Sequence, residues 1–363
     1  MNQQLNKNKI EIIGLMSGTS LDGLDIAHVN FNFENEQIDF ELINCETVPY
    51  STAILNQLQN YLAHSVPEMM ILDKRIGSFY AVKVNDFIEK FNIDKSKINA
   101  IASHGQTIFH QPQNGFTYQI GCGTTLAFKS GIDVINDFRT LDVVAGGQGA
   151  PLVPIGDFNL FSAKANAFLN IGGFTNISFK KNNDIIAFDI CSGNLPMNEA
   201  VKLIGLTYDK NGDLARKGKI DFTILEELQK LEHFQKSAPK SLGSEWLESE
   251  FYPIINKIES LENKLRTLIE HTAFEIINVL NTNNISSVYI TGGGAKNSFL
   301  VERIRFFFKG EVIVPSEEII DFKEAIIFAF LGARYLRNET TTVKSVTGAS
   351  IEVSSGTFHR AMR

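Results

Sequence analysis

Short apolar runs rich in β-branched residues alternate along this chain with longer segments whose apolar residues recur at helical spacing. The runs at 9–16 and 25–33 alternate apolar and polar residues, which predicts two strands joined as a hairpin. Helical patterns follow at about 53–64 and 67–91. Because strands and helices interleave, the pattern predicts an α/β protein.

The second half of the chain repeats this opening order of elements. A predicted strand at 167–171 is followed by a Gly-rich turn and by a returning strand at 177–180. Two copies that lie far apart in the chain favour duplicated domains over a solenoid of many repeats. We therefore expect an N-terminal lobe over residues 1–140, a C-terminal lobe over residues 141–363 and a cleft between them.

The apolar segment 321–337 predicts one long buried helix. Asp321 is placed to cap the N-terminus of this helix, and Glu324, three residues later, completes the pattern of a capping box. Further short strands are predicted where apolar residues cluster between turn signals, at 100–103, 117–120, 132–136 and 287–291.

The composition limits the classes of partner. The formal net charge of -7 and the pI of about 5.6 predict no general attraction to nucleic acid or to an anionic membrane surface. No segment approaches the roughly 18 uninterrupted apolar residues of a membrane span, and the N-terminus lacks a signal sequence, so we expect a cytoplasmic protein. The three cysteines lack C-x-x-C spacing and predict neither a disulfide framework nor a zinc site, and we assign no metal ligands.

The turn between the first two predicted strands is rich in glycine, serine and threonine. Such a turn can point several backbone N–H groups and hydroxyls at a phosphate, and its aspartates can hold Mg²⁺ through water. An ordinary hairpin turn is the alternative. The candidate nucleotide-binding residues here are Gly18, Thr19, Ser20, Leu21, Asp22, Gly23, Leu24 and Asp25.

A second Gly-rich turn follows the predicted strand at 167–171, and three glycines follow the one at 287–291. Two phosphate-type turns, one from each lobe, can hold a triphosphate from both sides, so the pair favours a nucleotide. Neither the Rossmann nor the P-loop spacing is present. The candidate nucleotide-binding residues in this half are Gly172, Gly173, Gly292, Gly293, Gly294 and Asn297.

One acidic residue, Asp189, closes a predicted strand and precedes a turn of small residues. A carboxylate there can take a proton from an attacking hydroxyl or water, and a turn-capping aspartate is the alternative. In the first half, His104, Gln106 and Arg139 follow predicted strands. These side chains suit a polyhydroxylated ligand, and the arginine suits a carboxylate, while a structural role is the alternative for His104.

Taken together, these motifs resemble the anhydro-N-acetylmuramic acid kinase family, and the match runs in order along nearly the whole chain. It is carried by MSGTSLDGLD at 16–25, SHGQT at 103–107, DFR at 137–139 with Asp142, GGQGAPLVP at 146–154, LNIGGFTNI at 169–177, PKS at 239–241, TGGGAKN at 291–297, EAIIFAFLGA at 324–333 and VTGAS at 346–350.

The resemblance implies a two-lobed, duplicated actin-like ATPase fold, of the ribonuclease H-like kind, with ATP and Mg²⁺ as cofactors and an amino sugar as substrate. It implies that water opens the 1,6-anhydro bridge as O6 is phosphorylated, giving N-acetylmuramic acid 6-phosphate and ADP in cell-wall recycling. Asp189 would be the general base, and the family suggests a homodimer. The residues that would line the sugar side are His104, Gln106, Arg139, Asn194 and Glu324.

The chain departs from the family pattern at three places near the expected sugar side. Residues 190–192 are Ile-Cys-Ser where the family has Thr-Gly-Pro, Cys122 replaces a carboxylate, and Ser244 replaces a basic residue. A kinase of the same fold that acts on another amino sugar is therefore one alternative. A non-catalytic, ATP-binding switch protein is another.

Overall fold

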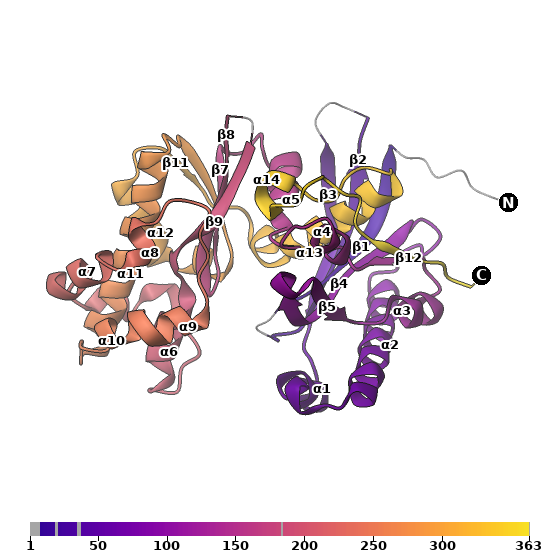
Figure 1. The fold of residues 1–363 in the computed structure, drawn as a ribbon, viewed down its shortest axis with the longest axis horizontal. Helices are drawn as coiled ribbons and strands as arrows, with labels where there is room; N and C mark the ends of the chain where they lie inside the picture. The colour runs from indigo at the N-terminus through magenta and orange to yellow at the C-terminus, as the bar shows by residue number, and fades with distance from the viewer. Residues whose placement is uncertain (1–7, 19–20, 35–37, 183, 363) are drawn as a thin grey trace. The chain divides into compact units, whose positions relative to one another are not determined.

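The computed structural model describes residues 8–18, 21–34, 38–182 and 184–362. Internal contacts divide the chain into two compact units, which we call unit 1 (Met1–Phe161 with Phe322–Arg363) and unit 2 (Ser162–Asp321). The lobe boundary expected after residue 140 lies inside unit 1. The helical segment at 140–160 and the C-terminal segment from residue 322 both belong to the same unit as the first sheet (Figure 1).

The sheet of unit 1 is mixed. Its strands are β1 (Lys9–Ser17), β2 (Leu24–Asn32), β3 (Asp39–Val48), β4 (Ala100–Gln111), β5 (Phe116–Ile120), β6 (Val134–Asn136) and β12 (Thr357–His359). Their order is β12-β6-β4-β1-β2-β3, and β5 pairs with β4. The first three strands form an antiparallel meander, β4 runs parallel to β1, and β6 runs parallel to β4.

Helices cover both faces of this sheet. Gly14 of β1 lies so close to Ala325 and Ala329 that a side chain at position 14 would overlap them, and a glycine in a strand often marks such a close approach. The opposite face carries an apolar core shared with the long second helix, including Ile13 and Ile76. The helices are α1 (Thr52–Gln59), η1 (Tyr61–Ala63), α2 (Val66–Lys90), η2 (Pro112–Asn114), α3 (Gly123–Ser130), α4 (Thr140–Val144), α5 (Val153–Leu160), α13 (Glu317–Leu336) and α14 (Lys344–Thr347).

Unit 2 repeats the sheet of unit 1. Its strands are β7 (Ala167–Ile171), β8 (Phe174–Lys181), β9 (Asp184–Ser192), β10 (Ser287–Thr291) and β11 (Glu311–Ile313). Their order is β11-β10-β7-β8-β9, with an antiparallel meander and two parallel strands beside it. This matches β6-β4-β1-β2-β3 in order and direction, so the predicted duplicated α/β fold is confirmed.

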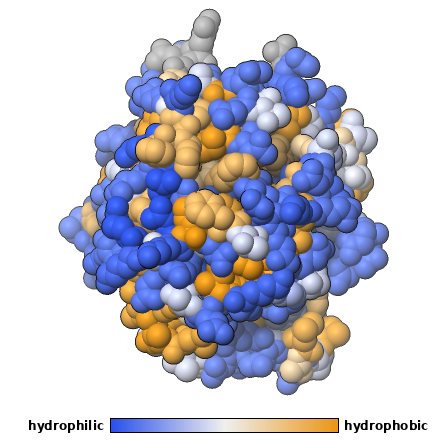
Figure 2. All heavy atoms as spheres, turned by 90° about the vertical axis from the view of Figure 1, so that its left-hand side faces the viewer, coloured by the Kyte–Doolittle hydropathy of each residue, from blue (hydrophilic) through white to orange (hydrophobic). Residues whose placement is uncertain are grey.

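The helices of unit 2 gather beside its sheet around an apolar core (Figure 1). The side of the molecule on which they lie is polar with scattered apolar patches (Figure 2). The helices are α6 (Asn194–Lys202), η3 (Lys210–Gly212), η4 (Ala215–Lys217), α7 (Phe222–Gln229), α8 (Glu232–Gln235), α9 (Ser244–Trp246), η5 (Leu247–Phe251), α10 (Tyr252–Ile255), α11 (Leu261–Thr282), η6 (Gly293–Lys296) and α12 (Ser298–Phe307).

The long helix expected at 321–337 is present, but it begins earlier, at Glu317. Ser316 precedes it, and the carbonyl oxygen of Ser316 accepts a hydrogen bond from the Ile320 N–H. Asp321 and Glu324 therefore lie inside α13, and the predicted capping box is wrong. The true start signal is Ser316 followed by two acidic residues in the first turn.

Candidate functional site

The first Gly-rich turn joins β1 to β2. Leu21 has a left-handed backbone with φ of 59°, and its N–H donates to the Gly18 carbonyl oxygen at 3.2 Å. Asp25, at the start of β2, accepts a hydrogen bond of 2.6 Å from the Thr47 hydroxyl. Thr19 and Ser20 lie outside the described residues. Binding of phosphate by this turn stays a prediction.

His104 and Arg139, both predicted for the sugar side, are bonded to each other in unit 1. Arg139 donates from Nε to His104 Nε2 at 3.0 Å and from Nη1 to the Gly149 carbonyl oxygen at 2.6 Å. Because Nε2 accepts, the imidazole proton lies on Nδ1, which donates to the Gly105 carbonyl oxygen at 2.8 Å. Burial and the charge of Arg139 lower the pKa of His104 to about 3. The imidazole is therefore neutral near pH 7.

Gln106, two residues after His104 on β4, is bonded to the end of β1. The Ser17 hydroxyl donates to Gln106 Oε1. Since the only hydroxyl proton of Ser17 is used there, the Tyr50 hydroxyl donates to Ser17 Oγ, at 2.6 Å. All three side chains are buried. The last residue of β1 and a predicted sugar ligand on β4 thus form one hydrogen-bonded network.

Asp142 acts on Arg139 indirectly, by holding Gly149. Its carboxylate is fully buried and accepts hydrogen bonds of 2.8 Å from the Gly149 N–H and from the Thr347 hydroxyl. The same Gly149 presents its carbonyl oxygen to Arg139. The sequence placed Asp142 within a family motif but gave it no contact, because the residue that it binds lies 205 positions later in the chain.

Glu324, on α13, belongs to the same region. Burial raises the pKa of its carboxyl, and the charges of Lys323 and Arg139 offset part of that rise. Burial lowers the pKa of Arg139 to about 10, and the Glu324 carboxylate acts against that change. The two groups are therefore close enough to influence each other. Unit 1 thus contains the predicted sugar-side residues His104, Gln106, Arg139 and Glu324, whereas the fifth, Asn194, belongs to unit 2.

In unit 2, the turn between β7 and β8 packs against the start of α6. The N–H groups of Gly193 and Asn194 donate to the carbonyl oxygens of Gly173 and Gly172, both at 2.8 Å. The Asn194 side chain donates from Nδ2 to the Ile171 carbonyl oxygen at 3.2 Å. Asn194 therefore fixes the conformation of the turn.

The glycines after β10 reach the same turn. Gly292 has φ of 79°, and a Cβ atom on it would lie 2.5 Å from Asn170 Oδ1 and 2.7 Å from the Ile171 carbonyl oxygen. Gly294 also packs against Ile171. The two segments predicted to bind nucleotide in this half are thus neighbours. Asn297 caps α12 by accepting a hydrogen bond of 3.1 Å from the Leu300 N–H, and its contact with nucleotide stays a prediction.

Asp189 lies inside β9 and not at its end, because the strand continues to Ser192. Asn176 of β8 pairs with Asp189, while the preceding Thr175 pairs with Cys191, so Ile190 is the extra residue of a β-bulge. A bulge changes the direction of neighbouring side chains and is common next to active sites.

The Asp189 carboxylate is partly buried and held by backbone. The Leu242 N–H donates to Asp189 Oδ2 at 2.9 Å. Burial raises the pKa of this carboxyl, and the hydrogen bond from Leu242 offsets part of the rise. A raised pKa makes a carboxylate a stronger base, which suits removal of a proton from water or a hydroxyl.

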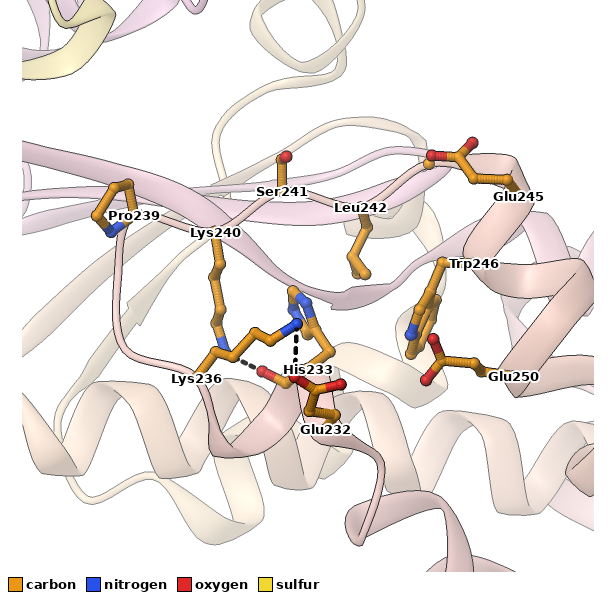
Figure 3. A pocket seen from close by; sticks show the side chains of 11 residues that line it. Glu232, His233, Lys236, Pro239, Lys240, Ser241, Leu242, Glu245, Trp246 and Glu250 are labelled. Atoms are coloured by element: carbon orange, nitrogen blue, oxygen red, sulfur yellow. Dashed lines mark hydrogen bonds and ion pairs between the residues drawn. The ribbon is translucent and has the colours of Figure 1, made fainter.

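A cavity of about 350 Å³ lies beside the segment that holds Asp189 (Figure 3). Asp189 is not among the residues that line it. The lining comes from α8, from the segment that follows and from the region of α9, and consists of Glu232, His233, Lys236, Pro239, Lys240, Ser241, Leu242, Gly243, Glu245, Trp246 and Glu250.

No group of three or more His, Cys, Asp or Glu side chains among the described residues is arranged to hold a metal ion. None of the helices formed by the described residues has both the length and the apolar character needed to cross a membrane.

The model of the anhydro-N-acetylmuramic acid kinase family matches residues 10–361 of the chain. The chain belongs to the anhydro-N-acetylmuramic acid kinase family. It is 36% identical to the family member of Francisella tularensis subsp. novicida, over 95% of this chain and 97% of that one. It is 37% identical to the member of Shewanella oneidensis, over 96% and 98%, and 35% identical to one from Bacillus cereus, over 95% and 97%.

Solved structures with a similar arrangement are much more distant than these kinases. One is the activator of the 2-hydroxyisocaproyl-CoA dehydratase from Clostridium difficile with bound ADPNP, at 14% identity and a TM-score of 0.43, over 90% of this chain and 97% of that one. Another is a ROK family glucokinase from Streptomyces griseus in complex with glucose and AMPPNP, at 11% identity and a TM-score of 0.40, over 88% and 98%. A likeness this distant says nothing about ligands.

The departures from the anhydro-N-acetylmuramic acid kinase pattern now have structural positions. Ile190 is the bulge residue of β9, and Ser244 begins α9. Cys122 accepts a hydrogen bond of 3.0 Å from Lys74 Nζ. Burial raises the pKa of the Cys122 thiol, but hydrogen bonds from Thr125 and Lys74 outweigh it, so the pKa lies below its ordinary value. The thiol therefore faces a cation.

Proposed function

We propose that this protein is an ATP-dependent kinase that hydrolytically opens 1,6-anhydro-N-acetylmuramic acid and phosphorylates O6, giving N-acetylmuramic acid 6-phosphate and ADP. The observation that carries this proposal is the family match over residues 10–361. The hydrogen bond between His104 and Arg139 and the mutual influence of Arg139 and Glu324 support it, because the family motifs place these three residues on the sugar side.

Asp189 is the proposed general base. It takes a proton from water as the water oxygen forms a bond to C1 of the sugar and the C1–O6 bond breaks. O6 then forms a bond to the γ-phosphorus of ATP, and ADP leaves with the electron pair of the broken P–O bond. The raised pKa of Asp189 brings its basicity closer to the working pH, which favours this proton transfer.

On the sugar side, Arg139 is the proposed partner of the substrate carboxylate. Its guanidinium is oriented by His104 Nε2 and by the Gly149 carbonyl oxygen, so little side-chain freedom is lost when it binds an anion. Because His104 is neutral and accepts from Arg139, it orients the arginine without a second positive charge. Gln106 and Glu324 are the proposed partners of the sugar hydroxyl and amide groups.

For the nucleotide, the proposed contacts are the backbone of the glycine segments at 172–173 and 292–294 in unit 2 and the turn at 18–25 in unit 1. Close packing of Gly292 and Gly294 on Ile171 leaves backbone, with no side chain, at this surface, which suits phosphate and a flat base. Asp22 and Asp25 are the proposed ligands of Mg²⁺ through water. Magnesium, when bound, neutralises phosphate charge. A homodimer in the cytoplasm, where ATP is available, completes the proposal.

The test is ADP release from purified protein with Mg²⁺ and ATP, with and without 1,6-anhydro-N-acetylmuramic acid, followed by mass analysis of the sugar. We expect ADP release that depends on the sugar, and a product heavier by one phosphoryl group and one water. Turnover only with a different amino sugar would mean that the proposed substrate is wrong. The changes at Cys122 and 190–192 are the reason to test other amino sugars. ATP binding with no sugar-dependent turnover would instead indicate the switch protein.

A further inference from the structure

Asp189, Lys240 and His233 form a closed ring of hydrogen bonds. The Asp189 N–H donates to the Lys240 carbonyl oxygen at 3.1 Å. Lys240 Nζ donates to the His233 carbonyl oxygen at 2.9 Å. His233 Nε2 lies 3.1 Å from the Asp189 carbonyl oxygen, which closes the ring. Figure 3 shows the bond from Lys240 to His233 beside the cavity.

His233 holds the bulge of β9 as well as Asp189. Its Nε2 is also 3.1 Å from the Ile190 carbonyl oxygen. Because both partners are carbonyl oxygens, Nε2 carries the proton and donates to both. Burial and the charges of Lys240 and Lys236 lower the pKa of His233, so this tautomer is neutral at pH 7. A neutral imidazole thus fixes the two peptide groups on which the direction of the Asp189 side chain depends.

Lys240 fixes the segment that contacts the carboxylate itself. This residue and Leu242 belong to the segment 239–242, whose Leu242 N–H donates to Asp189 Oδ2. The ammonium group of Lys240 is partly buried, and burial lowers its pKa, while the charges of Glu275 on α11 and Cys191 on β9 oppose that change. Its long side chain therefore ties the segment back to α8.

We infer that His233 and Lys240 are positioning residues for Asp189, which hold its carboxylate in one orientation through the ring and through segment 239–242. This inference rests on the proposed function of Asp189 as the general base. The sequence assigns neither residue such a role: His233 shows no metal-ligand spacing, and Lys240 lies only within the family motif PKS at 239–241. A shift of about 1 Å in a catalytic group can cost on the order of 100-fold in rate.

The first test replaces His233 with phenylalanine, which keeps a flat ring beside Phe234 and Trp246 but removes the donor. We expect kcat for the sugar to fall by about 10-fold to 100-fold, with the KM for ATP unchanged. The conservative His233→Gln variant retains an N–H donor, and we expect it to recover most of the lost activity. Equal activity of the Phe and Gln variants would overturn the inference.

The second test uses Lys240→Met, with Lys236→Met as its matched control. Lys236 lines the same cavity but forms an exposed ion pair with Glu232, so its loss leaves kcat unchanged. Because His233 and Lys240 act in one ring, we expect the His233→Phe, Lys240→Met double variant to lose about as much kcat as the worse single variant. A loss equal to the product of the two single losses would show that the residues act separately and would contradict the ring.

A third measurement does not depend on turnover. The pKa of the Asp189 carboxyl is followed by NMR with carbon-13-labelled aspartate, with Asp189→Asn for assignment. Burial has a larger effect on this pKa than the bond from Leu242, so release of segment 239–242 admits water and lowers the pKa in His233→Phe. An unchanged pKa overturns the inference. If the wild-type protein does not phosphorylate the sugar, the proposed function fails, while a lowered pKa would still show that the ring holds the carboxylate.

Discussion

The two units share a strand order, but equivalent strands carry different kinds of residue near their ends. In unit 1, β1 ends in Ser17 and β4 carries His104 and Gln106, and these buried side chains are bonded to their surroundings. In unit 2, the equivalent β10 runs directly into three glycines, of which Gly292 and Gly294 pack on the end of β7. One copy therefore presents side chains where the other presents backbone.

This difference follows from the ligands proposed for each copy. Hydroxyl, amide and carboxylate groups differ in the hydrogen bonds that they form, so side chains of several kinds are needed to distinguish them. Phosphates and a flat base are bound well by backbone N–H groups and by surfaces without side chains. A duplicated scaffold thus supports two kinds of recognition through changes at a few strand ends.

The largest expected effect concerns Asp189, a partly buried carboxylate on β9 of unit 2. Asp189→Asn keeps the shape of the side chain but removes its basicity, so we expect kcat to fall by about 1,000-fold or more. Nucleotide affinity, measured by titration calorimetry with ADP, should stay within about twofold. Loss of nucleotide binding would mean that Asp189 belongs to the nucleotide site, so that side chains and not only backbone would bind the nucleotide in unit 2.

Next is the requirement for glycine at the end of β10. Gly292→Ala places a Cβ atom against Asn170 and Ile171 and imposes a left-handed backbone on alanine, so we expect a loss of about 3 kcal/mol in the free energy of unfolding and at least about tenfold weaker ADP binding. Gly293→Ala is the matched control, because its nearest atom would be 3.5 Å away. Similar urea unfolding midpoints for the two variants would argue against backbone packing as the cause.

Buried titratable groups in both units make the stability depend on pH. Burial raises the pKa of Glu275 in unit 2 to about 7, so folding retains a proton that the unfolded chain releases above about pH 4.5. Stability is therefore lost as the pH rises from about 4.5 to 7. Glu275→Gln should remove this loss, with a gain of about 2 to 3 kcal/mol at pH 7.5 and little change at pH 4, as measured by urea unfolding.

For His104 in unit 1 the sign is opposite to that for Glu275. The pKa of His104 is lowered to about 3, so the unfolded chain binds a proton below about pH 6.5 that the folded unit does not. Its neutral form thus contributes stability that is lost as the pH falls from about 6.5 to 3. The buried His271 of unit 2, whose pKa is also about 3, adds the same acid dependence there. For the Glu275→Gln variant, a gain in stability at pH 4 as large as that at pH 7.5 would show that the raised pKa of Glu275 is not its cause.

The smallest expected effect concerns side-chain recognition in unit 1. Arg139→Lys retains the charge but cannot donate to both His104 and Gly149 in the same geometry. We expect the KM for the sugar to rise about tenfold, with the KM for ATP unchanged. Arg216→Lys, at an exposed pair with Glu302, should leave both values unchanged. An equal rise of both KM values for Arg139→Lys would place Arg139 outside the sugar side.

Local patterns predicted several strands, because alternation and Gly-rich turns leave a direct trace in the sequence, but they missed β3 and gave only the first four residues of β4. The strand predicted at 287–291 has the same bounds in the structure, and both hairpins are present. The start of α13 was misplaced because Asp321 and Glu324 have the spacing of a capping box, although the helix begins at Glu317 and Asp321 pairs with Lys296 at 2.6 Å. Spacing alone does not separate a cap from a surface ion pair.

The candidate site was predictable where a motif is continuous and not where contacts join distant segments. The residues His104, Gln106 and Arg139 followed from strand-end motifs. Asp142 bound to Thr347, and His233 bound to the bulge at Ile190, join residues that are far apart in the chain. No local pattern distinguishes His233 from any other histidine, so its place beside Asp189 became visible only from the fold.

Unit 1 is discontinuous in sequence, since residues 162–321 interrupt it. On the ribosome, β1 to β6 emerge first, but Ala325 and Ala329, which pack on Gly14, follow only after all of unit 2. At typical rates of synthesis this delay is on the order of ten seconds or more. Throughout that interval the part of the nascent sheet around Gly14 lacks the helix that covers it in the finished fold, so its apolar residues are open to contacts with other chains.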